Sequence, residues 1–160
     1  MFYRIEISNL IQLPTQITHL CLFTISSCLS RQYYFVNNRT TWTEAQAYCR
    51  QYYTDLATLE NANDTSSLTA AVNSSYNNLA WIGLYDDVEN IWIGLYRTRL
   101  WSDQSNSTYE NWLTGQPDNL NYVEHCTAAS LGNSGQWTDE NCNQTLPFFC
   151  YRGEFNKLFL

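Results

Sequence analysis

The chain has 160 residues and a formal net charge of -7; 44% of the residues are hydrophobic and 16% are aromatic. This length suits one domain with short flanking segments, and the apolar content is too high for a disordered chain. Because lysine and arginine together number only 8 and form no basic cluster, we expect no nucleic-acid partner.

Residues 1–30 are predicted to form a segment outside the folded domain. The apolar run between residues 20 and 29 is too short to span a bilayer, so we expect no membrane span. Small residues near its end, at Ser26, Ser27 and Ser30, are typical of a signal peptide that is cleaved near residues 27–30. We therefore predict a secreted, extracellular protein.

The domain is expected to start at residue 31 with a strand, because residues 32–36 are aromatic and β-branched. Thr41 and Glu44 have the spacing of a capping box, which predicts a helix over residues 42–52. A second helix is predicted to begin at an Asp64 N-cap and to continue to Val72.

After residue 78 the helical period disappears, and short aromatic segments between polar turn residues predict strands. Residues 126–130 and 147–151 are strand candidates, and Trp137 marks a third strand between them. Two helices followed by strands indicate an α+β fold. We interpret the tryptophans as core residues; they are Trp42, Trp81, Trp92, Trp101, Trp112 and Trp137.

The sequence Trp-Ile-Gly-Leu-Tyr occurs twice, at residues 81–85 and 92–96. Two copies so close together indicate a local duplication rather than a solenoid repeat. Only one copy can occupy a given strand position in the core, and the sequence leaves open which copy does so. An acidic cluster near the duplication is expected to form a solvated turn; it contains Asp86, Asp87 and Glu89.

Six cysteines without a Cys-x-x-Cys pair favour disulfides over a thiolate zinc site. Cleavage of the signal peptide would remove Cys21 and Cys28 and leave four cysteines, which can pair in three ways. Those four are Cys49, Cys126, Cys142 and Cys150. N-glycosylation sequons, which predict a glycoprotein, start at Asn38, Asn63, Asn73, Asn106 and Asn143.

Residues 116–139 contain four side chains that carry hard oxygen ligands, one amide and three carboxylates: Gln116, Asp118, Glu124 and Asp139. Calcium takes six to eight such oxygens, and water or ligand hydroxyls can supply the remainder. The alternative is that residues 115–119 form only a polar turn. We expect no enzyme activity, because neither His19 nor His125 has an evident serine or cysteine nucleophile as partner.

In combination, several segments resemble the C-type lectin-like domain family: residues 42–49, 81–84, 116–118, 124–126 and 137–139, with Cys142 and Cys150. The resemblance runs over residues 31–152 and leaves residues 153–160 as a C-terminal tail. It implies a C-type lectin-like fold with two helices, short antiparallel sheets and a long ligand-binding loop. It also implies two disulfides, Cys49–Cys150 and Cys126–Cys142.

The resemblance further implies that one calcium ion binds at residues Gln116, Asp118, Glu124 and Asp139, and that the Gln116–Pro117 peptide bond is cis. Lectins of this family use the same oxygens to bind two sugar hydroxyls. The Gln-Pro-Asp order implies glycans with galactose-type sugars. Tyr122 is a candidate for stacking on the sugar, and a homo-oligomer would supply avidity.

Thr138 departs from the family pattern, which has asparagine at this position of the calcium site. A hydroxyl is a poorer calcium ligand than an amide oxygen, so Thr138 predicts a weakened or lost site. The alternative function is therefore a calcium-independent domain of the same fold that binds a protein or another surface.

Overall fold

The computed structural model describes residues 31–153 except residues 74 and 89–97. Residues 1–30, predicted as a signal peptide, and residues 154–160 of the predicted tail lie outside the described residues. No helix in the described part of the chain is long and apolar enough to cross a membrane. The elements are β1 (Gln32–Thr40), α1 (Trp42–Tyr52), β2 (Asp55–Leu56), α2 (Ala62–Ala70), β3 (Leu79–Asp86), β4 (Arg99–Trp101), η2 (Leu120–Tyr122), β5 (Cys126–Ser130), η3 (Leu131–Asn133), β6 (Gln136–Glu140) and β7 (Leu146–Arg152).

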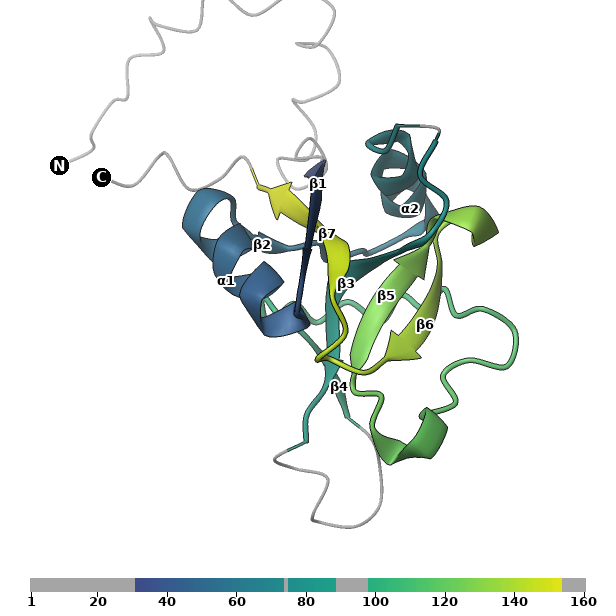
Figure 1. Cartoon of the computed structure of the whole chain (residues 1–160). Helices are drawn as coiled ribbons and strands as arrows, with labels where there is room; N and C mark the ends of the chain where they lie inside the picture. The colour runs from purple at the N-terminus through teal and green to yellow at the C-terminus, as the bar shows by residue number, and fades with distance from the viewer. Residues whose placement is uncertain (1–30, 74, 89–97, 154–160) are drawn as a thin grey trace, which may run out of the picture. The chain divides into compact units, whose positions relative to one another are not determined.

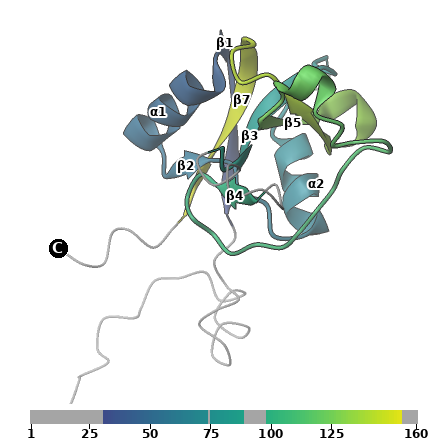
Figure 2. The ribbon, with the colours of Figure 1, turned by 90° about the horizontal axis from the view of Figure 1, so that it is seen from below.

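The strands form one sheet with the order β1-β7-β3-β5-β6, in which β2 also pairs with β7 and β4 with β3. The described strand pairs are antiparallel except β3 and β7, which run parallel at Trp81 and Phe148. Strand β7 lies between β1 and β3 in the sheet, antiparallel to β1 and parallel to β3. The helices α1 and α2 lie on opposite sides of these central strands (Figures 1 and 2). The predicted α+β class is confirmed.

Helix α1 has the predicted bounds and the predicted capping box. The Thr41 hydroxyl accepts a hydrogen bond from the Glu44 backbone N–H, and the Glu44 carboxylate accepts one from the Thr41 backbone N–H. Residues on one face of the helix, Trp42, Ala45 and Cys49, are buried. Capping and an apolar face thus fix α1 against the sheet.

Helix α2 begins earlier than predicted, and Asp64 is not its N-cap. The Asn61 side chain accepts hydrogen bonds from the backbone N–H groups of Asn63 and Asp64, which makes Asn61 the N-cap. The Asp64 carboxylate instead accepts a hydrogen bond from the Glu60 backbone N–H at 2.8 Å. The prediction was wrong because both side chains can cap, and Asn61 is the one that precedes the first turn.

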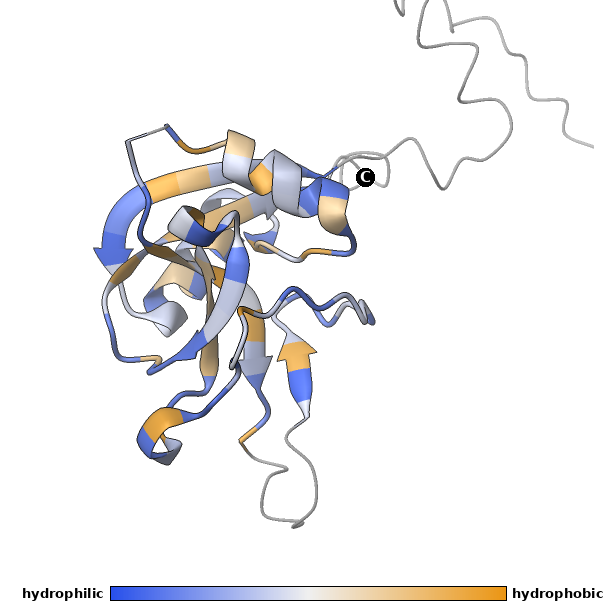
Figure 3. Ribbon diagram, turned by 90° about the vertical axis from the view of Figure 1, so that its right-hand side faces the viewer, coloured by the Kyte–Doolittle hydropathy of each residue, from blue (hydrophilic) through white to orange (hydrophobic). Residues whose placement is uncertain are grey.

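The first copy of the duplicated sequence forms β3, where Trp81 and Ile82 are fully buried. A Cβ atom at Gly83 would lie 3.1 Å from the Leu56 carbonyl oxygen, a tight contact, so glycine favours the close approach of β2 here. The second copy, residues 92–96, lies outside the described residues, as does Trp92. Figure 3 shows hydrophobic stretches, in orange, alternating with hydrophilic ones, in blue, along the strands and helices. The buried tryptophans are Trp42, Trp81, Trp101 and Trp137, whereas Trp112 is half-buried.

Two disulfides join elements that are distant in sequence. Cys49–Cys150 connects α1 to β7 across 101 residues, and Cys126–Cys142 connects the start of β5 to the segment before β7 across 16 residues. These are the two pairings that the resemblance implied. In the loop-entropy model, loops of about 100 and 15 residues stabilise the fold by roughly 4.7 and 3 kcal/mol.

Candidate functional site

The candidate site lies on the long connection between β4 and β5, residues 102–125. This connection is attached to the sheet at Trp112, which forms a parallel bridge with Trp137 of β6. The Leu113 N–H donates to the Trp137 carbonyl at 2.9 Å, and the Trp137 N–H donates to the Asn111 carbonyl at 2.8 Å. The bridge places the residues after Trp112 beside the second half of β6.

A tight turn orients the Gln-Pro-Asp segment toward β6. Gly115 has φ 88°, a left-handed conformation that glycine adopts without steric strain, and the Gln116–Pro117 peptide bond is cis. The Gln116 side-chain oxygen accepts a hydrogen bond from the Asp139 N–H at 3.2 Å. Gln116 therefore contacts the strand that carries the acidic half of the site.

Asp139 is the buried anchor of this site, with 3% of its surface exposed. Its two carboxylate oxygens accept hydrogen bonds from the backbone N–H groups of Asp118 at 2.9 Å and Asn119 at 3.0 Å. Hydrogen bonds to an ionised acceptor are stronger than bonds between neutral groups. Asp139 thereby holds the turn that follows Pro117 against β6.

Glu124 is brought back toward the same turn by η2. Residues around η2 adopt positive φ angles, 47° at Asn119, 56° at Asn121 and 60° at Tyr122. The Glu124 carboxylate accepts a hydrogen bond from the Leu120 N–H at 2.8 Å, and the Asn119 side-chain oxygen accepts one from the Glu124 N–H at 3.1 Å. These contacts close residues 119–124 into a compact loop.

Three carboxylates converge as a result: those of Asp118, Glu124 and Asp139 each offer an oxygen within 4.8 Å of the others. The pKa of Glu124 is raised above its ordinary value, first by burial and then by repulsion from Glu140, Asp139 and Asp118, against the opposing Leu120 N–H bond. Burial is thus the main cause of the raised pKa of Glu124, and the crowding of negative charge adds to it. Such a group of hard oxygens fits the ligand preference of calcium.

Comparisons with known proteins identify the family to which this fold belongs. The family model described as the lectin C-type domain matches residues 38–152. The chain belongs to the C-type lectin domain family. A lectin from Pleurodeles waltl is 30% identical over 128 residues, which are 77% of this chain and 71% of that protein.

Solved structures of C-type lectin relatives share the fold of this C-type lectin domain. Human lithostathine has a TM-score of 0.68 and 26% identity, over 78% of this chain and 93% of that one. The C-type lectin CEL-I from Cucumaria echinata has a TM-score of 0.66 and 28% identity, over 76% and 89% of the two chains. The predicted fold is therefore confirmed.

Within this C-type lectin domain, the structure brings together four candidate residues: Gln116, Asp118, Glu124 and Asp139. The other two candidates, Thr138 and Tyr122, have different surroundings. The Thr138 hydroxyl donates a hydrogen bond to the Glu140 carboxylate at 3.1 Å, since alternate residues of a strand share one face. Tyr122 is 87% exposed. Its ring is accessible to solvent, two residues before Glu124 in the chain.

Sequence reasoning missed Asn119 and Glu140. Asn119 ties Asp139 to Glu124, because its N–H bonds to the first and its side chain to the second. Asparagine tolerates left-handed φ angles and bonds to nearby backbone, which is the signal that could have identified it. Glu140 raises the pKa of Glu124 from the neighbouring strand.

The prediction that Asp86 belongs to a solvated turn was wrong. Its side chain is 2% exposed and lies 3.2 Å from Arg99 and 3.2 Å from His125. The reason is that Asp86 ends β3 and is the cross-strand partner of Arg99 in β4. Asp87 is half-buried, and Glu89 lies outside the described residues.

Proposed function

We propose that this domain is a calcium-dependent lectin whose site consists of Gln116, Asp118, Glu124 and Asp139. The convergence of three carboxylate oxygens within 4.8 Å carries this proposal. The ion would be held by these side chains, would neutralise their mutual repulsion and would offer open coordination positions to sugar hydroxyls. The Pleurodeles waltl relative and CEL-I, both described as lectins, support carbohydrate as the ligand class.

The order of amide and carboxylate supports a preference for galactose-type sugars. Gln116 presents an amide where the mannose-type pattern has a carboxylate. Asp118 presents a carboxylate where that pattern has an amide. Swapping these groups interchanges hydrogen-bond donors and acceptors around the ion. The exposed Tyr122 ring supports stacking on an apolar sugar face.

Disulfides and exposed sequons support an extracellular glycoprotein. Disulfides persist in oxidising compartments, and this domain has two. The sequon asparagines are all exposed: Asn38, Asn63, Asn73, Asn106 and Asn143. Assembly into a homo-oligomer would add avidity to single-site binding.

Thr138 supports the alternative, a calcium-independent domain that binds a protein or another surface. Its hydroxyl bonds to Glu140, so the strand supplies fewer oxygens to the site than an amide at this position would. The two functions differ in their response to chelation, because only the lectin mechanism requires the ion.

Retention on sugar resins tests the proposal. In calcium the protein should be retained on galactose resin more strongly than on mannose resin, and a chelator should release it. The matched control combines Gln116→Glu with Asp118→Asn, which keeps the net charge and should reverse the sugar preference. Retention that persists in chelator would contradict the calcium mechanism and favour the alternative.

A further inference from the structure

Asp86 is buried at the end of β3, where it lies between β4 and the residue that precedes β5. Its carboxylate lies 3.2 Å from the Arg99 guanidinium of β4 and 3.2 Å from the His125 imidazole, just before β5. The Asp86 backbone N–H also donates to the His125 carbonyl at 2.8 Å. A buried carboxylate is tolerated only when it is paired, so this arrangement restrains both partners.

Arg99 links Asp86 to the first end of the candidate calcium loop. Its guanidinium carbon lies 4.6 Å from the centroid of the Trp112 ring, a cation–π geometry. Trp112 forms the bridge to β6, three residues before Gly115. The ion pair and the ring contact together connect β3 to the residue from which the Gln-Pro-Asp turn departs.

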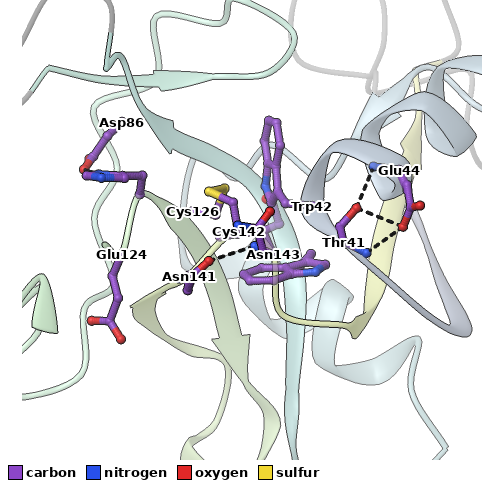
Figure 4. The surroundings of a disulfide bond; sticks show 12 residues. Thr41, Trp42, Glu44, Asp86, Glu124, Cys126, Asn141, Cys142 and Asn143 are labelled. Carbon is purple, nitrogen blue, oxygen red and sulfur yellow. Dashed lines mark hydrogen bonds and ion pairs between the residues drawn. A yellow bond between two sulfur atoms is a disulfide. The ribbon is translucent and has the colours of Figure 1, made fainter. Parts of the chain in front are cut away.

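His125 links Asp86 to the second end of the same loop. It directly follows Glu124, and the next residue, Cys126, pairs with Tyr85 of β3 and forms a disulfide with Cys142. Figure 4 shows the Glu124 carboxylate directed away from Asp86. The side-chain and backbone bonds to Asp86 therefore fix the backbone immediately beside a candidate ligand.

We propose that Asp86 is a positioning residue that fixes both ends of the calcium-binding loop, one through Arg99 and Trp112 and the other through His125. The predicted effect on calcium affinity rests on the proposed calcium function, but the restraint of Asp86 on the two ends of the loop exists without the ion. Ligands that are held in place before binding lose less conformational freedom when the ion arrives, which strengthens binding.

Hydrogen exchange and calcium titration of Asp86→Asn test this role. In calcium-free buffer, amide exchange should accelerate at both residues 111–118 and residues 119–125, while exchange in α1 keeps its wild-type rate. The calcium dissociation constant should rise by about 10-fold or more, as typically found when the partners of metal ligands are removed.

Two matched controls separate positioning from stability and charge. Asp55→Asn alters another buried aspartate with an arginine partner, at 3.1 Å from Arg50. Asp55 contacts the β4–β5 connection at Ser102, so this variant should leave exchange at residues 111–125 unchanged. Asp87→Asn removes the same charge one residue along the chain, from a half-buried side chain, and reports the effect of losing a negative charge at this end of β3. Exchange in Asp86→Asn that equals wild type, or that rises no more than in Asp55→Asn, would overturn the proposal.

If Asp86→Asn fails to fold, two milder variants test separately the link through Arg99 and the link through His125. Arg99→Lys keeps the positive charge but lacks the planar group over Trp112, so only residues 111–118 should exchange faster. His125→Gln should accelerate amide exchange only at residues 119–125. Wild-type exchange rates in both variants would refute the positioning role of Asp86. A wild-type protein that binds no calcium defeats the proposed function, while the calcium-free exchange still decides the role of Asp86.

Discussion

Asp139→Asn should destabilise the protein even when calcium is absent. The substitution preserves the shape of the side chain but replaces one of two acceptor oxygens with an NH₂ group, which faces a backbone donor. The wild-type oxygens bind the N–H groups of Asp118 and Asn119 at 2.9 and 3.0 Å, and the residue is 3% exposed. Since a hydrogen bond to a charged group contributes about 1.5–3 kcal/mol, the loss of one bond and weakening of the other should cost about 2–3 kcal/mol.

Glu124→Gln is the matched comparison, because it removes one negative charge from the same cluster. The amide oxygen can still accept the hydrogen bond from the Leu120 N–H, and repulsion from Asp118 and Asp139 disappears. We therefore expect calcium-free stability to remain at the wild-type value or to rise. Both variants should lose calcium binding, since each removes a carboxylate ligand.

Urea unfolding in chelator, followed by tryptophan fluorescence, distinguishes the two variants. A loss of about 2–3 kcal/mol should also lower the melting temperature of Asp139→Asn by about 4–12 °C in a domain of this size. Wild-type stability of Asp139→Asn would refute the anchoring role of Asp139. Equal destabilisation of the two variants would show that removal of charge, rather than the paired backbone bonds, controls this loop.

Three further predictions concern the site and its support. Thr138→Asn should strengthen calcium binding by about 10-fold, or about 1.4 kcal/mol, and calcium titration of the variant measures this; an unchanged affinity would mean that residue 138 is not a ligand position. Because folding raises the pKa of Glu124 above its ordinary value of 4.5, its contribution to calcium-free stability is full at lower pH and is lost as pH rises through the folded pKa. The free energy of unfolding, measured with urea across this acidic range, should show this loss with rising pH in wild type but not in Glu124→Gln. An identical pH dependence in the two proteins would contradict the prediction. Replacing both Cys126 and Cys142 with serine should lower the unfolding free energy by about 3 kcal/mol, which the same urea assay measures, and a smaller loss than about 1 kcal/mol would argue against loop closure as the source of stability.

Local signals predicted the first helix better than the second. Thr41 and Glu44 form an unambiguous capping box, so the start of α1 follows from adjacent residues. At α2, Asn61 and Asp64 are both competent caps, and the choice depends on which one meets free backbone N–H groups in the folded chain. The duplicated sequence likewise required the fold, because both copies have the same five residues and only the structure shows the first copy in β3.

The site shows the same division between local and long-range information. Gln116, Asp118, Glu124 and Asp139 could be named from motifs because carboxylates and amides at those spacings have a recognised chemistry. The burial of Asp86 could not be predicted, since it depends on cross-strand pairing with Arg99 and on the distant His125. Glu140 was also missed, because its effect on the pKa of Glu124 arises between residues that only the fold brings together.

Isothermal titration of the calcium-free protein with calcium tests the central claim most directly. We expect saturable binding of one ion per chain in the wild type and no binding in Glu124→Gln, whose calcium-free fold should be intact. Absence of saturable binding to the folded wild-type protein, or equal binding by Glu124→Gln, would contradict a calcium site built from Asp118, Glu124 and Asp139.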